Sequence, residues 1–162
     1  MRRDRTRWTV VQGILAPVQF LVCLISAALV LRFLATGQGL AAANLSVVIK
    51  TILLYTIMVT GSIWEKVVFD QWLFAAAFFW EDVVSMGVIA LHTFYIVGLS
   101  TGSLSSRTLM FVALAAYATY IVNATQFILK LRAARLMERD MSVAAAVVAP
   151  RRPATPPAEV MA

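Results

Sequence analysis

The sequence predicts an all-α integral membrane protein, a four-transmembrane-helix bundle with both termini cytoplasmic and a disordered C-terminal tail. Of the 162 residues, 61% are apolar and 14% are charged, and the mean hydropathy is +0.83. A soluble domain is closer to half apolar and a quarter charged. The apolar residues also fall in long blocks, and basic residues gather outside the first and last of these blocks.

Four apolar blocks are long enough to cross a membrane, because a helix needs about 20 residues to span the hydrocarbon core. An even number of spans returns the chain to the side where it began. Basic residues mark the cytoplasmic side of membrane proteins, and they flank the blocks at both ends: Arg2, Arg3, Arg5 and Arg7 before the first, and Lys130, Arg132, Arg135 and Arg139 after the last. The predicted spans are residues 13–35, 45–64, 75–99 and 107–130.

The chain is predicted to divide into a transmembrane domain, residues 1–140, and a tail, residues 141–162. The tail is rich in proline and alanine and lacks periodicity, which is typical of disorder. The first apolar block is too long for the core of a signal peptide. Cys23 is the only cysteine, so no intrachain disulfide can form. Outside the blocks there is no basic patch with interleaved aromatic residues, and we therefore expect no nucleic-acid partner.

The third predicted span contains the most unusual polar residues of the sequence. Glu81 and Asp82 stand side by side within an apolar run, and His92 follows. Eleven residues make almost three helical turns, so Glu81 and His92 share a face and lie about 16 Å apart along the axis. Ser85 and Val88 lie between them on that face, whereas Asp82 points about 100° away. Ionisable residues are costly inside a membrane and generally mark a functional site.

The other spans add polar residues at two depths. Counting from the predicted inner ends, the carboxyl groups of Glu65, Glu81 and Asp82 lie in the cytoplasmic half, whereas Lys50 and His92 lie in the other half at similar depth. We therefore predict a carboxylate-rich pocket that opens toward the cytoplasm, and a Lys50–His92 pair deeper in the bundle. The first span adds Gln12 and Gln19 to the inner half. Further polar residues of this half are Lys66 at the end of the second span and Asn123, Gln126 and Lys130 on one face of the fourth.

Each of these residues also has a purely structural interpretation. Asn123 and Gln126 can join helices by hydrogen bonds, and the lysines can extend toward lipid headgroups. His92 is equally consistent with a hydrogen-bonded core residue. Glu81 and Asp82 can both stabilise the start of the third helix. The residues alone leave these alternatives open.

Four strings in order resemble the 3-vinyl bacteriochlorophyllide hydratase family of phototrophic bacteria. Together they run from Arg7 to Leu136, which is nearly all of the chain outside the tail. The strings are RWTVVQGILAPVQFLV (7–22), VIKTILLYTIMVTGSIWEKVVF (48–69), AFFWEDVVSMGVIALHTFY (77–95) and AAYATYIVNATQFILKLRAARL (115–136).

The resemblance implies a hydro-lyase of bacteriochlorophyll biosynthesis in the bacterial inner membrane. Its reaction would add water to the 3-vinyl group of chlorophyllide a or 3-vinyl bacteriochlorophyllide, giving the 3-(1-hydroxyethyl) derivative. The expected partners are the pigment, membrane lipid and other pigment-biosynthesis enzymes. Hydration is redox-neutral, so we expect no cofactor; the substrate carries its own Mg.

The chemistry suits the polar residues. An acid must protonate the terminal vinyl carbon, and a base must take a proton from the water that attacks the resulting cation. The candidate acid and base are Glu81, Asp82 and Glu65. The candidate substrate-binding residues are His92 as an axial ligand to the substrate Mg, Asn123 and Gln126 to orient the water, and Lys66, Lys130 or Arg132 to meet the pigment's propionate.

Two other classes of function fit parts of this pattern. A small proton-coupled transporter also carries a few intramembrane carboxylates, although such proteins usually contain repeats or helices broken at the midplane. In this sequence the acids lie toward one side. A non-catalytic pigment-binding assembly factor would share every pigment-binding feature and lack turnover.

Overall fold

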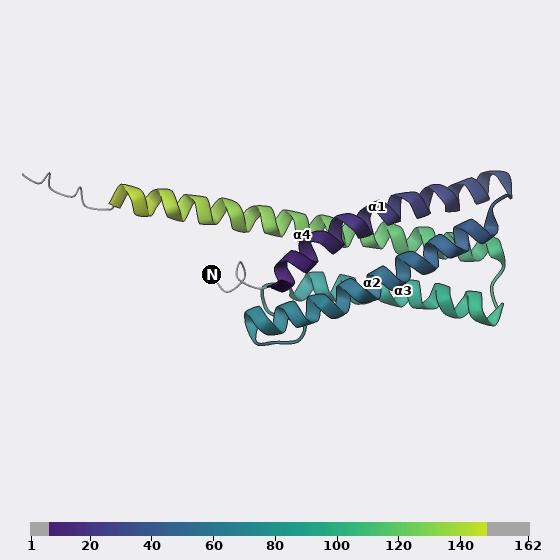
Figure 1. The fold of residues 1–162 in the computed structure, drawn as a ribbon, viewed down its shortest axis with the longest axis horizontal. Helices are drawn as coiled ribbons and strands as arrows, with labels where there is room; N and C mark the ends of the chain where they lie inside the picture. The colour runs from purple at the N-terminus through teal and green to yellow at the C-terminus, as the bar shows by residue number, and fades with distance from the viewer. Residues whose placement is uncertain (1–6, 149–162) are drawn as a thin grey trace, which may run out of the picture. The chain divides into compact units, whose positions relative to one another are not determined.

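The computed structural model describes residues 7–148, and this part of the chain consists of long α-helices and short connections, without a strand (Figure 1). All four helices are long and apolar enough to cross a membrane. The predicted all-α class and the four spans are therefore confirmed, and the cytoplasmic placement of both termini stays a prediction. The helices are α1 (Arg7–Thr36), α2 (Leu40–Phe69), α3 (Phe79–Thr101) and α4 (Ser106–Val148).

The helices differ from the predicted spans mainly at their ends. The third helix begins at Phe79 rather than at residue 75, because residues 70–78 form a turn between α2 and α3. Asp70 and Phe74 both have a φ of 59° in this turn. A left-handed backbone conformation ends a helix, and apolar composition alone does not reveal it.

The chain forms two compact units, one up to Gln126 and one from Phe127 onward. Helix α4 continues to Val148, so residues 141–148 of the predicted tail are helical; they include an alanine run with high helix propensity. The remaining tail residues, 149–162, and the basic residues Arg2, Arg3 and Arg5 lie outside the described part of the chain. The predicted division at residue 140 stays a prediction.

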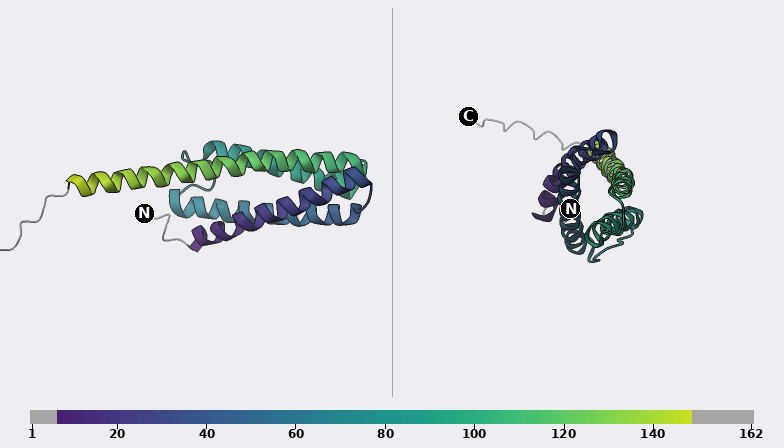
Figure 2. Two further views of the ribbon diagram at one scale, coloured as in Figure 1. Left: turned by 90° about the horizontal axis from the view of Figure 1, so that it is seen from above. Right: turned by 90° about the vertical axis from the view of Figure 1, so that its right-hand side faces the viewer.

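In the first unit, α1 to α4 follow one another around a bundle (Figure 2). Helices α1 and α2 run antiparallel and are joined near both ends by polar contacts. Gln12 Nε2 donates to Thr60 Oγ1 over 2.7 Å at one end, and the hydroxyls of Ser26 and Ser46 lie 2.6 Å apart at the other. The hydroxyl of Tyr117 also bonds Ser26, over 2.5 Å, and thereby connects α4 to α1.

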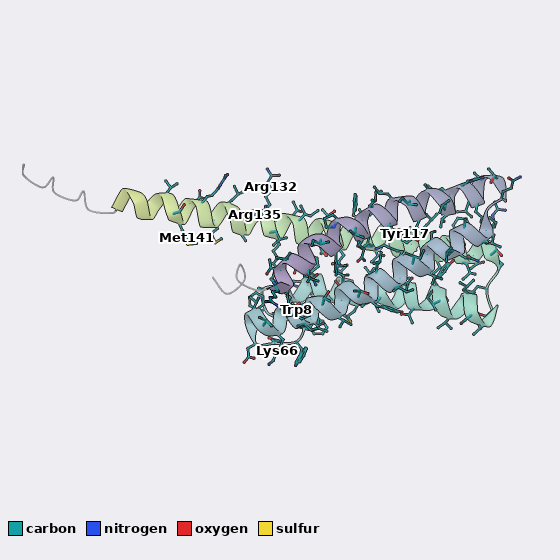
Figure 3. All side chains as sticks on the ribbon, viewed as in Figure 1. Trp8, Lys66, Tyr117, Arg132, Arg135 and Met141 are labelled. Carbon is teal, nitrogen blue, oxygen red and sulfur yellow. The ribbon has the colours of Figure 1, made fainter. Side chains whose placement is uncertain are left out.

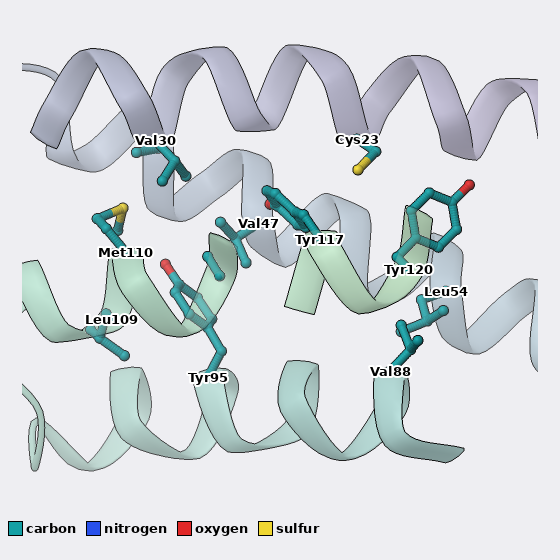
Figure 4. Close-up of a cluster of buried hydrophobic side chains, with 12 residues drawn as sticks. Cys23, Val30, Val47, Leu54, Val88, Tyr95, Leu109, Met110, Tyr117 and Tyr120 are labelled. Carbon is teal, nitrogen blue, oxygen red and sulfur yellow. The ribbon is translucent and has the colours of Figure 1, made fainter. Parts of the chain in front are cut away.

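The interior combines an apolar cluster with a polar stripe. On α3 the buried residues recur at spacings of four and three, which confirms that the predicted face of this helix points inward: Glu81, Ser85, Val88, His92 and Tyr95. The apolar cluster of the bundle is shown in Figure 4 and includes Cys23, Val30, Val47, Leu54, Val88, Tyr95, Leu109, Met110, Tyr117 and Tyr120.

Large apolar side chains also cover the outer surface of the four helices. Examples are Ile14, Leu45, Ile52 and Phe94, each more than half exposed. In water, such a surface would cost about 25 cal/mol for each Å² of apolar area. Hydrocarbon removes this cost, so the outer surface fits a membrane as solvent.

Reporter fusions test the predicted orientation of the bundle. With both termini cytoplasmic, fusions at residue 40 and at residue 103 should read periplasmic, because these positions follow an odd number of spans. A fusion at residue 72, in the α2–α3 turn, should read cytoplasmic and serves as the matched control. A cytoplasmic signal at residue 40 or 103 would contradict this topology.

Candidate functional site

Three buried carboxyl groups lie at the end of the bundle where α2 ends and α3 begins. Glu65 is in the last turns of α2 and is 5% exposed; Glu81 and Asp82 are in the first turn of α3 and are 7% and 3% exposed. The three carboxyl groups therefore lie at one end of the bundle, whereas the predicted pocket that opens toward the cytoplasm stays a prediction. Asp82, expected to point away from the stripe of Glu81, is also buried.

Glu65 and Asp82 form a carboxyl pair, because a side-chain hydrogen bond joins them. Two ionised carboxylates can only accept hydrogen bonds, so this contact requires at least one proton between them. The turn supplies two further donors. The N–H of Phe74 donates to Asp82 Oδ2 over 2.7 Å, and the N–H of Ala75 donates to Glu65 Oε2 over 3.3 Å.

The left-handed conformation of Phe74 belongs to this arrangement. A bulky residue rarely adopts a φ of 59°, because such a conformation costs about 1–3 kcal/mol and persists only where the surrounding contacts compensate for it. A hydrogen bond to a charged group contributes about 1.5–3 kcal/mol. The bond from the Phe74 N–H to Asp82 is thus of the right size to hold the turn in its strained form.

The start of α3 favours negative charge at the same place. Glu81 and Asp82 lie in its first turn, where the helix macrodipole stabilises an anion. The side chain of the N-cap residue, Phe78, has no polar atom and makes no capping bond. Asp82 instead binds the turn and Glu65, so its contacts go beyond a stabilised helix start.

Aromatic residues lie close to the carboxyl pair in the sequence, and their rings pack on one another. The rings of Trp64, Phe69 and Phe78 meet edge to face, with centroids 5.6 to 5.9 Å apart. The indole N–H of Trp64 donates to Thr9 Oγ1 over 3.0 Å and ties this cluster to α1. This end of the bundle therefore combines buried carboxyl groups with packed aromatic rings.

Deeper in the first unit, several buried polar atoms have no hydrogen-bond partner among the described residues. Asn123 Nδ2 donates to Ser85 Oγ over 2.7 Å, which is the interhelical role that the sequence left open, but its Oδ1 remains unpartnered. Buried polar groups are generally satisfied, so these atoms point to water or a ligand. The other unpartnered atoms are both amide atoms of Gln19, Lys50 Nζ, His92 Nε2 and Gln126 Oε1.

His92 has its tautomer fixed by the backbone. Its Nδ1 lies 2.8 Å from the carbonyl oxygen of Val88, and this nitrogen must carry the proton, since a carbonyl only accepts. The Nε2 lone pair then faces the interior. Lys50 and His92 are both 0% exposed and close enough for their charges to interact, as the predicted Lys50–His92 pair requires.

The structure does not bring every candidate residue into this interior. Lys66 binds Asp70 at the exposed end of α2, with its Nζ 2.8 Å from Asp70 Oδ1 and 3.0 Å from the Asp70 carbonyl oxygen (Figure 3). Lys130 belongs to the second unit. The backbone N–H groups of Phe74 and Ala75 were not predicted as part of the site, and the sequence carries no signal for them.

The two tyrosines of α4, Tyr117 and Tyr120, were not predicted either. Both rings lie on the inner side of α4, near Cys23 of α1 (Figure 4). Tyr117, Tyr120 and Asn123 follow one another at intervals of three residues, which is a helical spacing. The buried face of the fourth span could therefore have been predicted from the sequence.

The comparison with known proteins identifies the family. The family model for 2-vinyl bacteriochlorophyllide hydratase (BCHF) matches residues 1–133. The chain belongs to this family. The resemblance found in the four sequence strings is thereby confirmed.

Two curated relatives are similar over most of their length. A 2-vinyl bacteriochlorophyllide hydratase of Cereibacter sphaeroides is 67% identical over 143 residues, which cover 88% of this chain and 87% of the relative. The protein of the same name from Rhodobacter capsulatus is 66% identical over 135 residues, which cover 83% of this chain and 78% of the relative. Hydratases are hydro-lyases. No solved structure matches the chain.

Hydrogen exchange tests whether the carboxyl pair holds the turn. Replacing Asp82→Ala removes the acceptor of the Phe74 N–H, and exchange at this amide should become faster by about 10- to 100-fold, the equivalent of one hydrogen bond to a charged group. Asp82→Asn keeps an acceptor oxygen and should stay within a few-fold of the unmodified chain. Unchanged exchange in Asp82→Ala would show that different contacts hold the turn.

Proposed function

We propose that this chain is a hydratase that adds water to the vinyl group of a bacteriochlorophyllide or chlorophyllide a. We take the 2-vinyl group of the relatives' names to be the 3-vinyl group named above, under a different numbering of the ring. The main structural support for this proposal is the buried Glu65–Asp82 carboxyl pair, which accepts hydrogen bonds from two N–H groups of the turn that precedes α3. Family membership supplies the substrate class.

The carboxyl pair can supply the proton that begins the reaction. One carboxyl group donates its proton to the terminal vinyl carbon, and a C–H bond forms as the double bond opens. Positive charge then develops on the inner carbon, where the conjugated macrocycle delocalises it. The pair is left with one more negative charge, which stabilises the nearby cation electrostatically.

Water completes the reaction and restores the pair. Its oxygen attacks the inner carbon, a C–O bond forms, and the released proton returns to the pair. The sum is one water added, with no electron gained or lost, and we propose that the reaction needs no cofactor. Glu81 is a third carboxyl group able to take part in this proton transfer.

The amide side chains of α4 are suited to position the attacking water. Asn123 is 8% exposed, and within residues 7–148 neither its Oδ1 nor Gln126 Oε1 accepts a hydrogen bond. A water molecule that donates to these oxygens keeps its lone pairs available for attack. We propose this role for both residues, in addition to the bond that Asn123 makes to Ser85.

His92 is suited to bind the Mg of the pigment. With Nδ1 bonded to the Val88 carbonyl, the Nε2 lone pair is in the form that a metal ligand needs, and a carbonyl acceptor of this kind is usual for metal-binding histidines. We propose that His92 is an axial ligand to the substrate Mg. The inner membrane of a phototrophic bacterium, with its lipid and other pigment-biosynthesis enzymes, is the proposed setting.

A direct assay separates this function from its two rivals. Membranes that contain the chain, given chlorophyllide a, should form a product heavier by one water with a blue-shifted red absorption band, because the vinyl group leaves the conjugated system. An assembly factor would bind the pigment and release it unchanged. A transporter would move protons in vesicles that lack pigment. Either outcome without hydrated product would refute the proposal.

Replacing Glu65→Gln tests the carboxyl pair. Glutamine can still hydrogen-bond Asp82 but cannot deliver a proton, so the hydration rate should fall by about 10²- to 10⁴-fold, the usual contribution of one proton-transfer group. Asp70→Asn is the matched control, since it removes an acid near the same end of α2 that is 86% exposed; its rate should be nearly unchanged. Glu81→Gln, measured in parallel, tests the third carboxyl group.

Two further measurements control for indirect effects of Glu65→Gln. Pigment binding and the amount of protein in the membrane should remain close to those of the unmodified chain, because the substitution preserves side-chain size and hydrogen bonding. A Glu65→Gln protein that retains more than a tenth of the rate would exclude the pair as the proton donor.

Replacing His92→Ala tests the Mg ligand. If His92 binds Mg, the substitution should weaken chlorophyllide binding several-fold more than binding of the Mg-free pheophorbide, measured by pigment absorption. Equal loss of affinity for both pigments would make His92 a core residue. Tyr117→Phe, which keeps the ring near His92, should leave the difference between the two pigments unchanged.

A further inference from the structure

Lys50 is a buried amine for which the described residues provide no hydrogen-bond partner. The residue is 0% exposed, and its Nζ is without such a partner. It does contact the ring of Tyr120, whose centroid lies 3.5 Å from Nζ. A cation–π contact stabilises a buried ammonium by less than the desolvation that an unpaired buried ion costs.

The described groups whose charge acts on Lys50 do not include an anion. The charge of Lys50 interacts with the thiol of Cys23 on α1 and with the imidazole of His92 on α3, and neither group is ordinarily an anion near neutral pH. The acids are distant. Asp82 is ten residues from His92 on α3, which is about 15 Å along the axis.

A second donor is available one turn away. Gln19 precedes Cys23 by four residues on α1 and therefore lies on the same face of that helix. It is 1% exposed, and both its amide nitrogen and its amide oxygen lack a hydrogen-bond partner within residues 7–148. An ammonium and an amide N–H in this situation are suited to receive the two oxygens of one carboxylate.

We propose that Lys50, assisted by Gln19, binds the free carboxylate of the pigment substrate. This inference rests on the proposed function and adds the recognition of one substrate group to it. A chlorophyllide carries a propionate side chain as the free acid. Inside an apolar bundle that carboxylate and the Lys50 ammonium each need a partner, and pairing them removes both costs at once.

The distance between the carboxyl pair and Lys50 fits a single elongated substrate that contacts both. The carboxyl pair that would act on the vinyl group and the level of Lys50 are separated by about 15 Å along α3, which is comparable to the size of the macrocycle with its propionate. His92 lies beside Lys50. A pigment lying along the bundle would therefore place its vinyl edge at Glu65 and Asp82 and its carboxylate at Lys50.

This arrangement predicts a preference for the free acid over its ester. The unmodified chain should bind chlorophyllide a on the order of 10- to 100-fold more tightly than chlorophyllide a methyl ester, because the ester lacks the charge that strengthens hydrogen bonds to Lys50. Lys50→Met should bind both pigments equally, with the affinity that the unmodified chain has for the ester. Lys50→Arg should retain the preference. Absorption titration of the purified protein measures all of these affinities.

Matched variants test whether a different residue binds the carboxylate. Lys66→Met and Lys130→Met should keep the preference for the acid over the ester. Loss of this preference in either variant would show that the replaced lysine binds the carboxylate. Gln19→Leu gives a second test, since it should weaken binding of the acid and leave binding of the ester unchanged. Lys50→Met replaces a buried cation by an apolar chain of similar length, a change that commonly preserves or increases stability; helical circular dichroism verifies the fold.

Two results would overturn the proposal. One is equal binding of acid and ester by the unmodified chain, and the other is an undiminished preference in Lys50→Met. Binding does not require turnover, so this experiment is independent of the hydration assay. An acid preference that depends on Lys50, in a protein that forms no hydrated product, would uphold the carboxylate site and refute the hydratase.

Discussion

The structure depends on one constraint, which is that polar groups inside an apolar bundle must find their partners inside it. The outer surface of the helices is apolar, and a membrane offers no hydrogen bonds at its centre. The Glu65–Asp82 pair meets this constraint with its own proton and with the N–H groups of the turn. The hydroxyls of Ser26, Ser46 and Tyr117 meet it by bonding one another. These contacts join α1 to α2 and α4, and α2 to α3.

Helical periodicity made part of the site predictable from the sequence, whereas local backbone geometry hid the rest. The inward face of α3, from Glu81 to Tyr95, is a consequence of a spacing of four and three residues. The burial of Asp82 does not follow from this spacing, because it depends on how residues 70–78 fold back over the end of the bundle. That fold requires a left-handed Phe74, for which an aromatic residue gives no sequence signal. Lys50 was placed at the depth of His92, but spacing could not show that no described residue accepts a hydrogen bond from it.

The polar groups that lack partners are as informative as those that have them. The carboxyl pair is satisfied by groups of the protein itself and can hold a proton ready before substrate arrives. In contrast, His92 Nε2, Lys50 Nζ and the Gln19 amide are unpartnered within the described part of the bundle. Unpaired buried polar groups are unfavourable in the free protein, and a ligand with matching groups removes this cost when it binds. Such a site therefore discriminates strongly against ligands that lack the matching groups. A Mg-carrying macrocycle with a carboxylate has both matching groups.

The same reasoning decides between the lysines as the partner of that carboxylate. Lys66 is already bonded to Asp70 at the exposed end of α2. An ion pair between Lys66 and the substrate carboxylate would lie at the surface, where such a pair contributes at most about 1 kcal/mol. Binding a pigment there would also bring its carboxylate to the end of the bundle that holds the proposed catalytic acids, where like charges repel. Lys50 lies away from those acids and beside His92. In the proposed arrangement, a carboxylate at Lys50 would separate the negative charge of the substrate from the carboxyl pair and would leave the pair free to protonate the vinyl group.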